Sequence, residues 1–157
     1  MVLPETEWRL LEVQTNNAFL NMALDESISE HVAQGKVLPT IRFFRWLPSA
    51  VSIGYFQSLE QEVNQQKCKE LGVDIVRRKT GGGAVYHDFE GEITYSVIAP
   101  ENLFPKGITE SYWEICGWIV RGLKHLGLHA EFKPVNDIII GGKKISGNAQ
   151  TRRNSVL

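Results

Sequence analysis

The chain has 157 residues, a hydrophobic content of 43%, a charged content of 22% and a formal net charge of −1. This length allows one domain with a core, and the near-neutral charge disfavours nucleic-acid binding, which normally requires a basic surface. Because the N-terminus carries no basic region followed by an apolar run and no stretch is long enough to cross a bilayer, we expect no signal peptide and no membrane partner. Cys68 and Cys116 match no metal or CxxC spacing, which indicates reduced thiols in a cytoplasmic protein.

The first predicted elements are one helix and two strands. Segment 17–34 is expected to be a helix, because apolar side chains recur at helical spacing at Leu20, Leu24, Ile28 and Val32. Segments 41–46 and 50–56 are rich in β-branched and aromatic residues, and we expect strands joined at Pro48 in a hairpin.

The middle of the chain predicts a second helix followed by strands. Ser58 and Gln61 have the spacing of a capping box, which would begin a helix that ends at Gly72. Short extended segments follow at 73–78, 84–87 and 93–97. In the last of these, apolar and polar residues alternate as in a half-buried strand.

The C-terminal part predicts a long helix over 109–126, with an apolar stripe formed by Tyr112, Ile115, Ile119, Leu123 and Leu126. Gly127 is placed to end this helix, and Cys116 lies beside the stripe, which favours a buried thiol. Strands are expected at 129–133 and 138–140. Neighbouring strands without intervening helices indicate an α+β domain with a mixed, largely antiparallel sheet flanked by helices, rather than a doubly wound parallel sheet.

A two-residue turn at Gly141 and Gly142 predicts a hairpin whose register can be written down. The expected pairs are Ile140 with Lys143, Ile139 with Lys144, Ile138 with Ile145, and Asp137 with Ser146. One face would then be apolar, whereas the other would bring Asp137, Lys144 and Ser146 together. Lys144 is therefore a better site candidate than Lys143, although a solvated hairpin with two surface lysines fits the same pattern.

The segment 77–88 combines two arginines, three consecutive glycines and a His-Asp pair. Glycine loses the most backbone entropy on folding, so such a run indicates an unusual turn or close approach to a ligand. The spacing matches neither a Walker A loop nor GxGxxG, which leaves an anion-binding loop and a plain wide turn as alternatives. His87 and Asp88 alone favour a structural role, and we find no secure Ser-His-Asp or Cys-His set and no metal-site spacing.

These motifs together resemble the lipoate–protein ligase family, part of the biotin/lipoate ligase group. The matching segments, in the family's order, are 21–26, 51–57, 77–88, 136–138 and 142–150. The resemblance implies a class II synthetase-like catalytic domain over 1–157. It also implies that this domain is incomplete at its C-terminus, where an accessory domain or second polypeptide would continue it.

The resemblance implies that ATP and Mg²⁺ activate lipoate to lipoyl-AMP. The lipoyl group would then pass to a lysine of a lipoyl domain of a 2-oxoacid dehydrogenase E2 subunit, or of the glycine-cleavage H protein. One alternative is a related octanoyltransferase, which uses no ATP; the lack of cysteine in 126–143 argues against the group that forms a thioester there. The other is a non-catalytic subunit or fragment that binds a lipoyl domain.

The resemblance also assigns roles to single residues. Lys144 is implied as the catalytic residue, in contact with the acyl carbonyl and the phosphate. The other contacts to ATP or lipoyl-AMP are implied for Arg78, Gly82, Gly83, Ala84, Val85, Tyr86, Asn136 and Asp137. Lipoate contacts are implied for Lys144, His87 and Gly83, and Asp137 is implied as a ligand of Mg²⁺. An apolar tunnel for the acyl chain, or equally the core, would use Val51, Ile53, Tyr55 and Val85.

Overall fold

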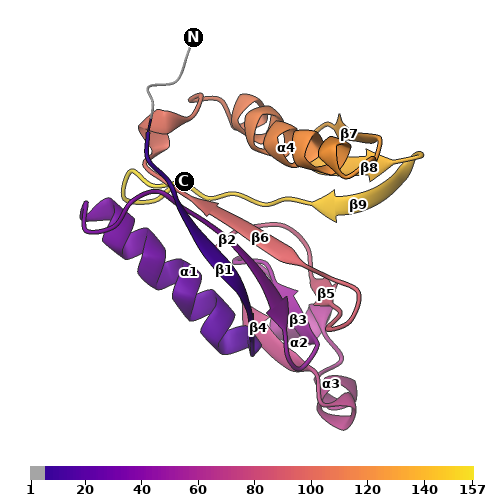
Figure 1. The fold of residues 1–157 in the computed structure, drawn as a ribbon. Helices are drawn as coiled ribbons and strands as arrows, with labels where there is room; N and C mark the ends of the chain where they lie inside the picture. Colours follow the sequence, from indigo (N-terminus) through magenta and orange to yellow (C-terminus); the bar gives the residue numbers. More distant parts are fainter. Residues whose placement is uncertain (1–5) are drawn as a thin grey trace. The chain divides into compact units, whose positions relative to one another are not determined.

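The computed structural model describes residues 6–157, which form two compact units. One unit comprises the described residues up to Pro100 together with Thr151–Leu157, and the other comprises Glu101–Gln150. Each combines helices with small sheets (Figure 1), so the predicted α+β class is confirmed. None of the helices in residues 6–157 has the length and apolar character needed to span a bilayer.

The first unit contains two mixed three-stranded sheets. Its strands are β1 (Arg9–Asn16), β2 (Thr40–Trp46), β3 (Ala50–Ile53), β4 (Asp74–Arg77), β5 (Val85–His87) and β6 (Thr94–Ile98). β2 lies between the parallel β1 and the antiparallel β6, while β3 lies between the parallel β4 and the antiparallel β5. The expected hairpin of β2 and β3 at Pro48 is therefore wrong, because β1 and β6 already occupy both edges of β2.

Helix α1 (Ala18–Ala33) packs on strands of both sheets (Figure 1). Its start is set by Asn17, whose side chain accepts a hydrogen bond from the Leu20 N–H. The expected apolar stripe is only partly correct, because Leu20 is 46% exposed. The buried positions are Ala18, Asn21, Ile28 and Val32.

A buried arginine explains the polar residues on the inner face of α1. Arg42 on β2 is 2% exposed, and its guanidinium lies 2.5 Å from an Asp25 oxygen and donates to Asn21. Burial raises the pKa of Asp25, while the charge and hydrogen bond of Arg42 and a hydrogen bond from Ser96 act in the opposite direction. Asn21 and Asp25 are therefore the polar partners that allow Arg42 to be buried, because a buried charge requires hydrogen-bonding or charged partners.

The predicted single helix after Ser58 is two short helices, α2 (Leu59–Glu62) and α3 (Gln65–Leu71). The capping box is wrong, because Ser58 makes no side-chain cap, and Asn64 instead caps α3 by accepting from the Lys67 N–H. The end at Gly72 is correct, since this residue has a left-handed conformation with φ of 64°.

The second unit packs α4 (Ile108–His125) on an antiparallel sheet. Its strands are β7 (Ala130–Lys133), β8 (Asp137–Ile140) and β9 (Lys143–Gly147), with β8 in the centre. A short 3-10 helix, Glu101–Leu103, precedes α4. The predictions for Gly127, which has φ of 80°, and for Cys116, which is fully buried, are confirmed.

The hairpin of β8 and β9 follows the predicted register for two pairs and then departs from it. Ile140 pairs with Lys143 and Ile139 with Lys144, and both turn glycines have positive φ, as expected. A bulge then shifts the register, so that Ile138 faces Ser146. Asp137 consequently lies opposite Gly147 rather than Ser146. Ile145 does not enter the predicted apolar face and is 48% exposed.

Candidate functional site

Two loops of the first unit cross at very short distance. A Cβ placed on Gly54 would lie 2.0 Å from the carbonyl oxygen of Gly82, so only glycine fits at this crossing. The Tyr55 N–H donates to the Thr80 carbonyl at 2.9 Å. Arg77 fixes the first loop through its backbone. The guanidinium donates to the carbonyl oxygens of Gly54, Tyr55 and Gln57 at 3.0, 3.1 and 2.7 Å. The second half of segment 51–57 and the glycine run are therefore one structural feature.

Arg78 holds the second loop, as Arg77 holds the first. Guanidinium has five N–H donors, and Arg78 directs its donors to Thr80 Oγ1, Ser52 O, Ser52 Oγ, Gly81 O and Gly83 O, at 3.2, 3.0, 3.1, 2.7 and 2.8 Å. Burial lowers the pKa of Arg78. The two arginines thus bind different segments of backbone, Arg77 the carbonyl groups of Gly54, Tyr55 and Gln57 and Arg78 those of Ser52, Gly81 and Gly83.

The hydrogen bonds of Arg78 fix the direction of two peptide N–H groups. In a trans peptide the C=O and the following N–H point in opposite directions. Because the carbonyl groups of Gly81 and Gly83 point to Arg78, the N–H groups of Gly82 and Ala84 point away from it. Gly82 and Ala84 are exposed, and Gly82 has φ of 94°, which favours glycine. Outward N–H groups of this kind suit an anionic ligand.

The structure assembles a Ser-His-Glu set that the sequence did not reveal. His87 is 8% exposed, with Nε2 2.8 Å from Ser52 Oγ and Nδ1 2.7 Å from Glu92 Oε1. Trp46 stacks on the imidazole at 4.1 Å between ring centres. Asp88 does not join this set. Its Oδ1 accepts hydrogen bonds from the N–H groups of Glu90 and Gly91 and so caps a turn. Asp88 therefore has the structural role that the sequence favoured.

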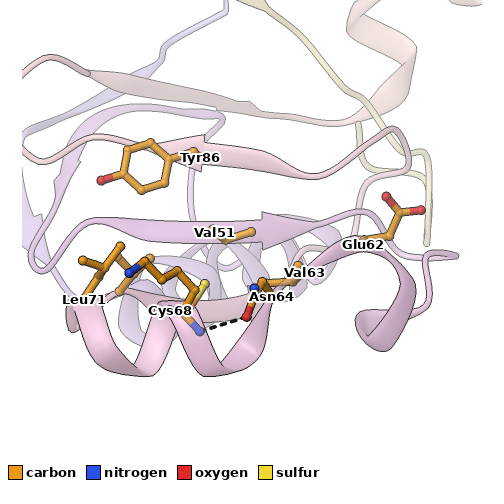
Figure 2. A pocket seen from close by; sticks show the side chains of 9 residues that line it. Val51, Glu62, Val63, Asn64, Cys68, Leu71 and Tyr86 are labelled. Carbon is orange, nitrogen blue, oxygen red and sulfur yellow. Dashed lines mark hydrogen bonds between the residues drawn. The ribbon is translucent and has the colours of Figure 1, made fainter.

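His87 and Tyr86 point to opposite faces of β5, as strand alternation requires. Tyr86 lines a cavity of about 240 Å³ together with Val51, Glu62, Val63, Asn64, Lys67, Cys68, Leu71 and Val73. Figure 2 shows Tyr86 and the α3 residues Leu71 and Cys68 on opposite sides of Val51. Of the four residues expected in an acyl tunnel, Val51 lines this cavity, whereas Ile53 is 2% exposed in the core. The cavity is smaller than most small-molecule sites, which span about 300–1,000 Å³.

In the second unit, Lys144 and Asp137 come together across the hairpin, as the sequence predicted. Lys144 Nζ lies 2.8 Å from Asp137 Oδ1, and the ammonium side chain is 58% exposed. The contact is an ion pair without hydrogen-bond geometry, since the buried Oδ1 has no hydrogen-bond partner within residues 6–157. The open end of the hairpin is closed by Asn136 and Asn148, whose side chains donate to each other's carbonyl groups. Asn136 is thus adjacent to the pair and supports its strand.

Gly147 provides the space into which Lys144 folds. A Cβ at position 147 would lie 2.7 Å from Lys144 Nζ and 3.6 Å from Asp137 Oδ1. We therefore expect Gly147→Ala to displace the lysine with little loss of stability, because only a flexible side chain must move. Acyl transfer, the activity that the family resemblance implies, should fall by about tenfold or more, since small displacements of a reacting group are costly. Rate measurements with thermal unfolding as the control test this, and an unchanged rate would contradict it.

The sequence reasoning missed Ser52, Glu92, Gly54 and Gly147 as site residues. Ser52, Gly54 and Gly147 lie within segments that resemble the family, whereas Glu92 does not, and the role of each depends on a contact with a segment distant in sequence or on a strand register. The glycine within VSIGYFQ was visible as part of a motif, but its purpose depends on the crossing with the glycine run.

The comparisons with known proteins agree on one family. The family model for the lipoyl protein ligase A/B catalytic domain matches residues 17–157. Octanoyltransferase LipM of Macrococcus caseolyticus is 38% identical over an alignment of 178 positions, which covers 98% of this chain and 64% of the relative. The LipM of Moorella thermoacetica is also 38% identical, with 99% and 64% covered. The chain therefore spans about 64% of the length of the curated relatives it matches.

Solved structures give the same result. The bi-partite lipoate protein ligase of Thermoplasma acidophilum, studied with its E2 lipoyl domain, has a TM-score of 0.85 and 36% identity, covering 97% of this chain and 59% of that one. A lipoate-protein ligase A bound with ATP has a TM-score of 0.81 and 36% identity, covering 96% and 63%.

Proposed function

The chain belongs to the lipoyl protein ligase A/B catalytic domain family, and we propose that it transfers an octanoyl group to a lysine of a lipoyl domain. The observation that carries this proposal is the exposed Lys144 ammonium held beside the part-buried Asp137 carboxylate, within the segment that the family model matches. A positioned ammonium group stabilises the negative charge that develops on an acyl carbonyl during transfer. The names of the curated relatives support octanoyl as the acyl group.

A second candidate is ATP-dependent ligation of lipoate, the main expectation from the sequence. Two observations favour it: the solved relative with bound ATP, and the lack of cysteine in 126–143, where one group of octanoyltransferases forms its thioester. Cys116 is fully buried, and a reactive cysteine needs partial exposure.

A role for Mg²⁺ belongs only to the second candidate, because only that reaction uses ATP. The carboxylate of Asp137 is a hard oxygen ligand of the kind that suits the ion, and it would hold Mg²⁺ in the position where it now pairs with Lys144. No group of three His, Cys, Asp or Glu side chains within the described part of the chain forms a metal site. Mg²⁺ usually binds through one or two carboxylates together with substrate phosphates, so it does not require such a group. The ion would offset the negative charge of ATP at the acyl carboxylate.

Each unit has its own role in the proposal. Lys144 contacts the acyl carbonyl, and Asp137 with Asn136 sets its position. The glycine run from Gly82 onward binds an anionic or carbonyl group through its outward N–H groups. We further propose that the acyl chain binds near His87. We also propose that the acceptor is an E2 lipoyl domain like the one studied with the Thermoplasma ligase.

The donor decides between the two candidates. The full chain would be incubated with an unmodified lipoyl domain and either octanoyl-acyl carrier protein without ATP, or lipoate with ATP and Mg²⁺. We expect octanoyl transfer from the carrier protein, read by mass spectrometry of the acceptor. An acceptor with its target lysine changed to arginine is the control. Modification only with lipoate and ATP would replace the first candidate by the second, and binding of the lipoyl domain without modification by either donor would favour a non-catalytic module.

A further inference from the structure

Two chains of hydrogen bonds in the first unit end on one carboxylate oxygen. The first runs from Arg78 through Ser52 and His87 to Glu92 Oε1, with distances of 3.1, 2.8 and 2.7 Å. The second runs from Trp46 Nε1 through Thr94 Oγ1 to the same oxygen, with distances of 2.7 and 2.6 Å. Among residues 6–157, only Arg78 and His87 form hydrogen bonds with Ser52 Oγ, and both belong to the first chain.

The direction of every hydrogen in these chains follows from their ends. Guanidinium can only donate, so Ser52 Oγ accepts from Arg78, and His87 Nε2 is the one acceptor among residues 6–157 to which the Ser52 hydrogen can be donated. Nε2 is then an acceptor, the ring hydrogen lies on Nδ1, and Nδ1 donates to Glu92. Indole also only donates, so Thr94 accepts from Trp46 and donates to Glu92.

Glu92 is thus the acceptor on which both chains depend. Burial alone would raise the pKa of Glu92, but the hydrogen bonds from His87 and Thr94 outweigh it and leave this pKa below its usual value. The carboxylate form, which accepts from both neighbours, is therefore the one that the surroundings stabilise.

The other end of the first chain leads to the glycine run. The Arg78 guanidinium that donates to Ser52 Oγ also turns the carbonyl groups of Gly81 and Gly83 inward. The outward direction of the Gly82 and Ala84 N–H groups therefore depends on where Ser52 holds the guanidinium.

We propose that Glu92 is a positioning residue, which acts through His87, Ser52 and Arg78 to aim the N–H groups of Gly82 and Ala84 at the substrate. In this arrangement His87 is a neutral ring with its hydrogen on Nδ1. Ser52 is 1% exposed, His87 is 8% exposed and Trp46 covers one face of the ring, so a substrate does not reach the Ser52 hydroxyl group or Nε2. The imidazole therefore holds the chain of hydrogen bonds and does not serve as a general base. The catalytic consequence rests on the proposed function, whereas the structural consequence does not.

The structural test is NMR of the full chain with ¹⁵N-labelled histidine and backbone, in which the His87 signals are assigned with a His87→Asn variant. We expect hydrogen on Nδ1 and none on Nε2 in the wild type. In Glu92→Gln, which keeps the size of the side chain and removes its charge, we expect the population of this tautomer to fall, because a neutral amide oxygen is a weaker acceptor than a carboxylate. The amide signals of Gly82 and Ala84 should move, although the side chain of Glu92 is hydrogen-bonded to His87 and Thr94 and not to either of them.

The matched control is Glu90→Gln, the same change at an exposed residue of the same turn, which should move none of these signals. If Glu92→Gln does not fold, Ser52→Ala cuts the chain between Arg78 and His87 and should move the same two amide signals. A wild-type ring with hydrogen on Nε2, or amide signals of Gly82 and Ala84 that stay in place in the folded variant, would overturn the proposal.

Activity provides the second arm. With whichever donor the wild type uses, kcat of Glu92→Gln should fall by about 10²-fold, while Glu90→Gln keeps the wild-type rate. A reduced population of this tautomer with an unchanged kcat would refute the catalytic part. If the wild type transfers no acyl group from any donor, the proposed function fails, and the NMR outcome still decides whether Glu92 controls the loop.

Discussion

Replacing Lys144 with alanine is expected to lower kcat for acyl transfer by about 10²–10³-fold, the usual cost of losing one well-placed contact to a developing charge. Lys144 is the exposed cation that the hairpin and Gly147 hold beside Asp137, at 2.8 Å. Alanine removes the charge without disturbing the core, because the lysine side chain is mostly exposed. The measurement is steady-state transfer to a lipoyl domain, with circular dichroism to confirm folding.

The hairpin itself supplies the matched control for this prediction. Lys143 is the neighbouring lysine, exposed and on the other face of β9, where it pairs with Ile140. Lys143→Ala removes the same charge from the same strand and should retain the wild-type rate. Equal losses in both variants would mean that net charge on the hairpin matters rather than the position of one ammonium group, and the role of Lys144 would be wrong.

The hairpin also shows what a sequence can and cannot predict at a site. Two glycines with positive φ fixed the turn, and the first two residue pairs followed from counting outward. The bulge beyond them leaves no mark in the sequence. It moves Gly147, rather than Ser146, opposite Asp137, and this places a residue without a side chain where Lys144 folds back. The lysine and its partner were predictable, whereas the residue that makes room for them was not.

The fold shows the same division. The helices α1 and α4 were predictable because their spacing and caps are local, but β1 was missed. A register shift between Leu11 and Gln14 interrupts its alternation, which is the signal that a strand prediction uses. The stripe on α1 misled at Leu20 because the helix buries Asn21 instead, and that choice is dictated by Arg42 on a different strand.

To predict the set of Ser52, His87 and Glu92 from the sequence, one would have to know how the strands pair. Ser52 and His87 come together because β3 and β5 are antiparallel with Ala50 opposite His87. That register cannot be counted from a tight turn, since the chain passes through α2, α3 and β4 before it returns. The family resemblance identified the motif residues, but it contained no information about which of them support the others.

Gly54→Ala is expected to be the most damaging single-methyl substitution in the first unit. The added carbon would lie 2.0 Å from the Gly82 carbonyl oxygen and 3.2 Å from the Gly81 carbonyl carbon, and both are backbone atoms that cannot rotate away. The two crossed loops must separate, which breaks the hydrogen bond from Tyr55 to Thr80 and displaces the glycine run. Overpacking of this kind typically costs about 1–3 kcal/mol and occasionally more, and we expect the upper end, about 3 kcal/mol, in the free energy of unfolding.

A second glycine makes that prediction sharp. A Cβ on Gly81 meets nothing within 4 Å, and the residue is not among those with positive φ, so Gly81→Ala should change the free energy of unfolding by less than about 1 kcal/mol. Denaturant titrations of the two variants give the comparison directly. The contrast arises because rigid backbone atoms lie at one position and open space at the other, although both glycines belong to the same pair of loops. Equal stabilities would show that the loops are not crossed as closely as the structure has them.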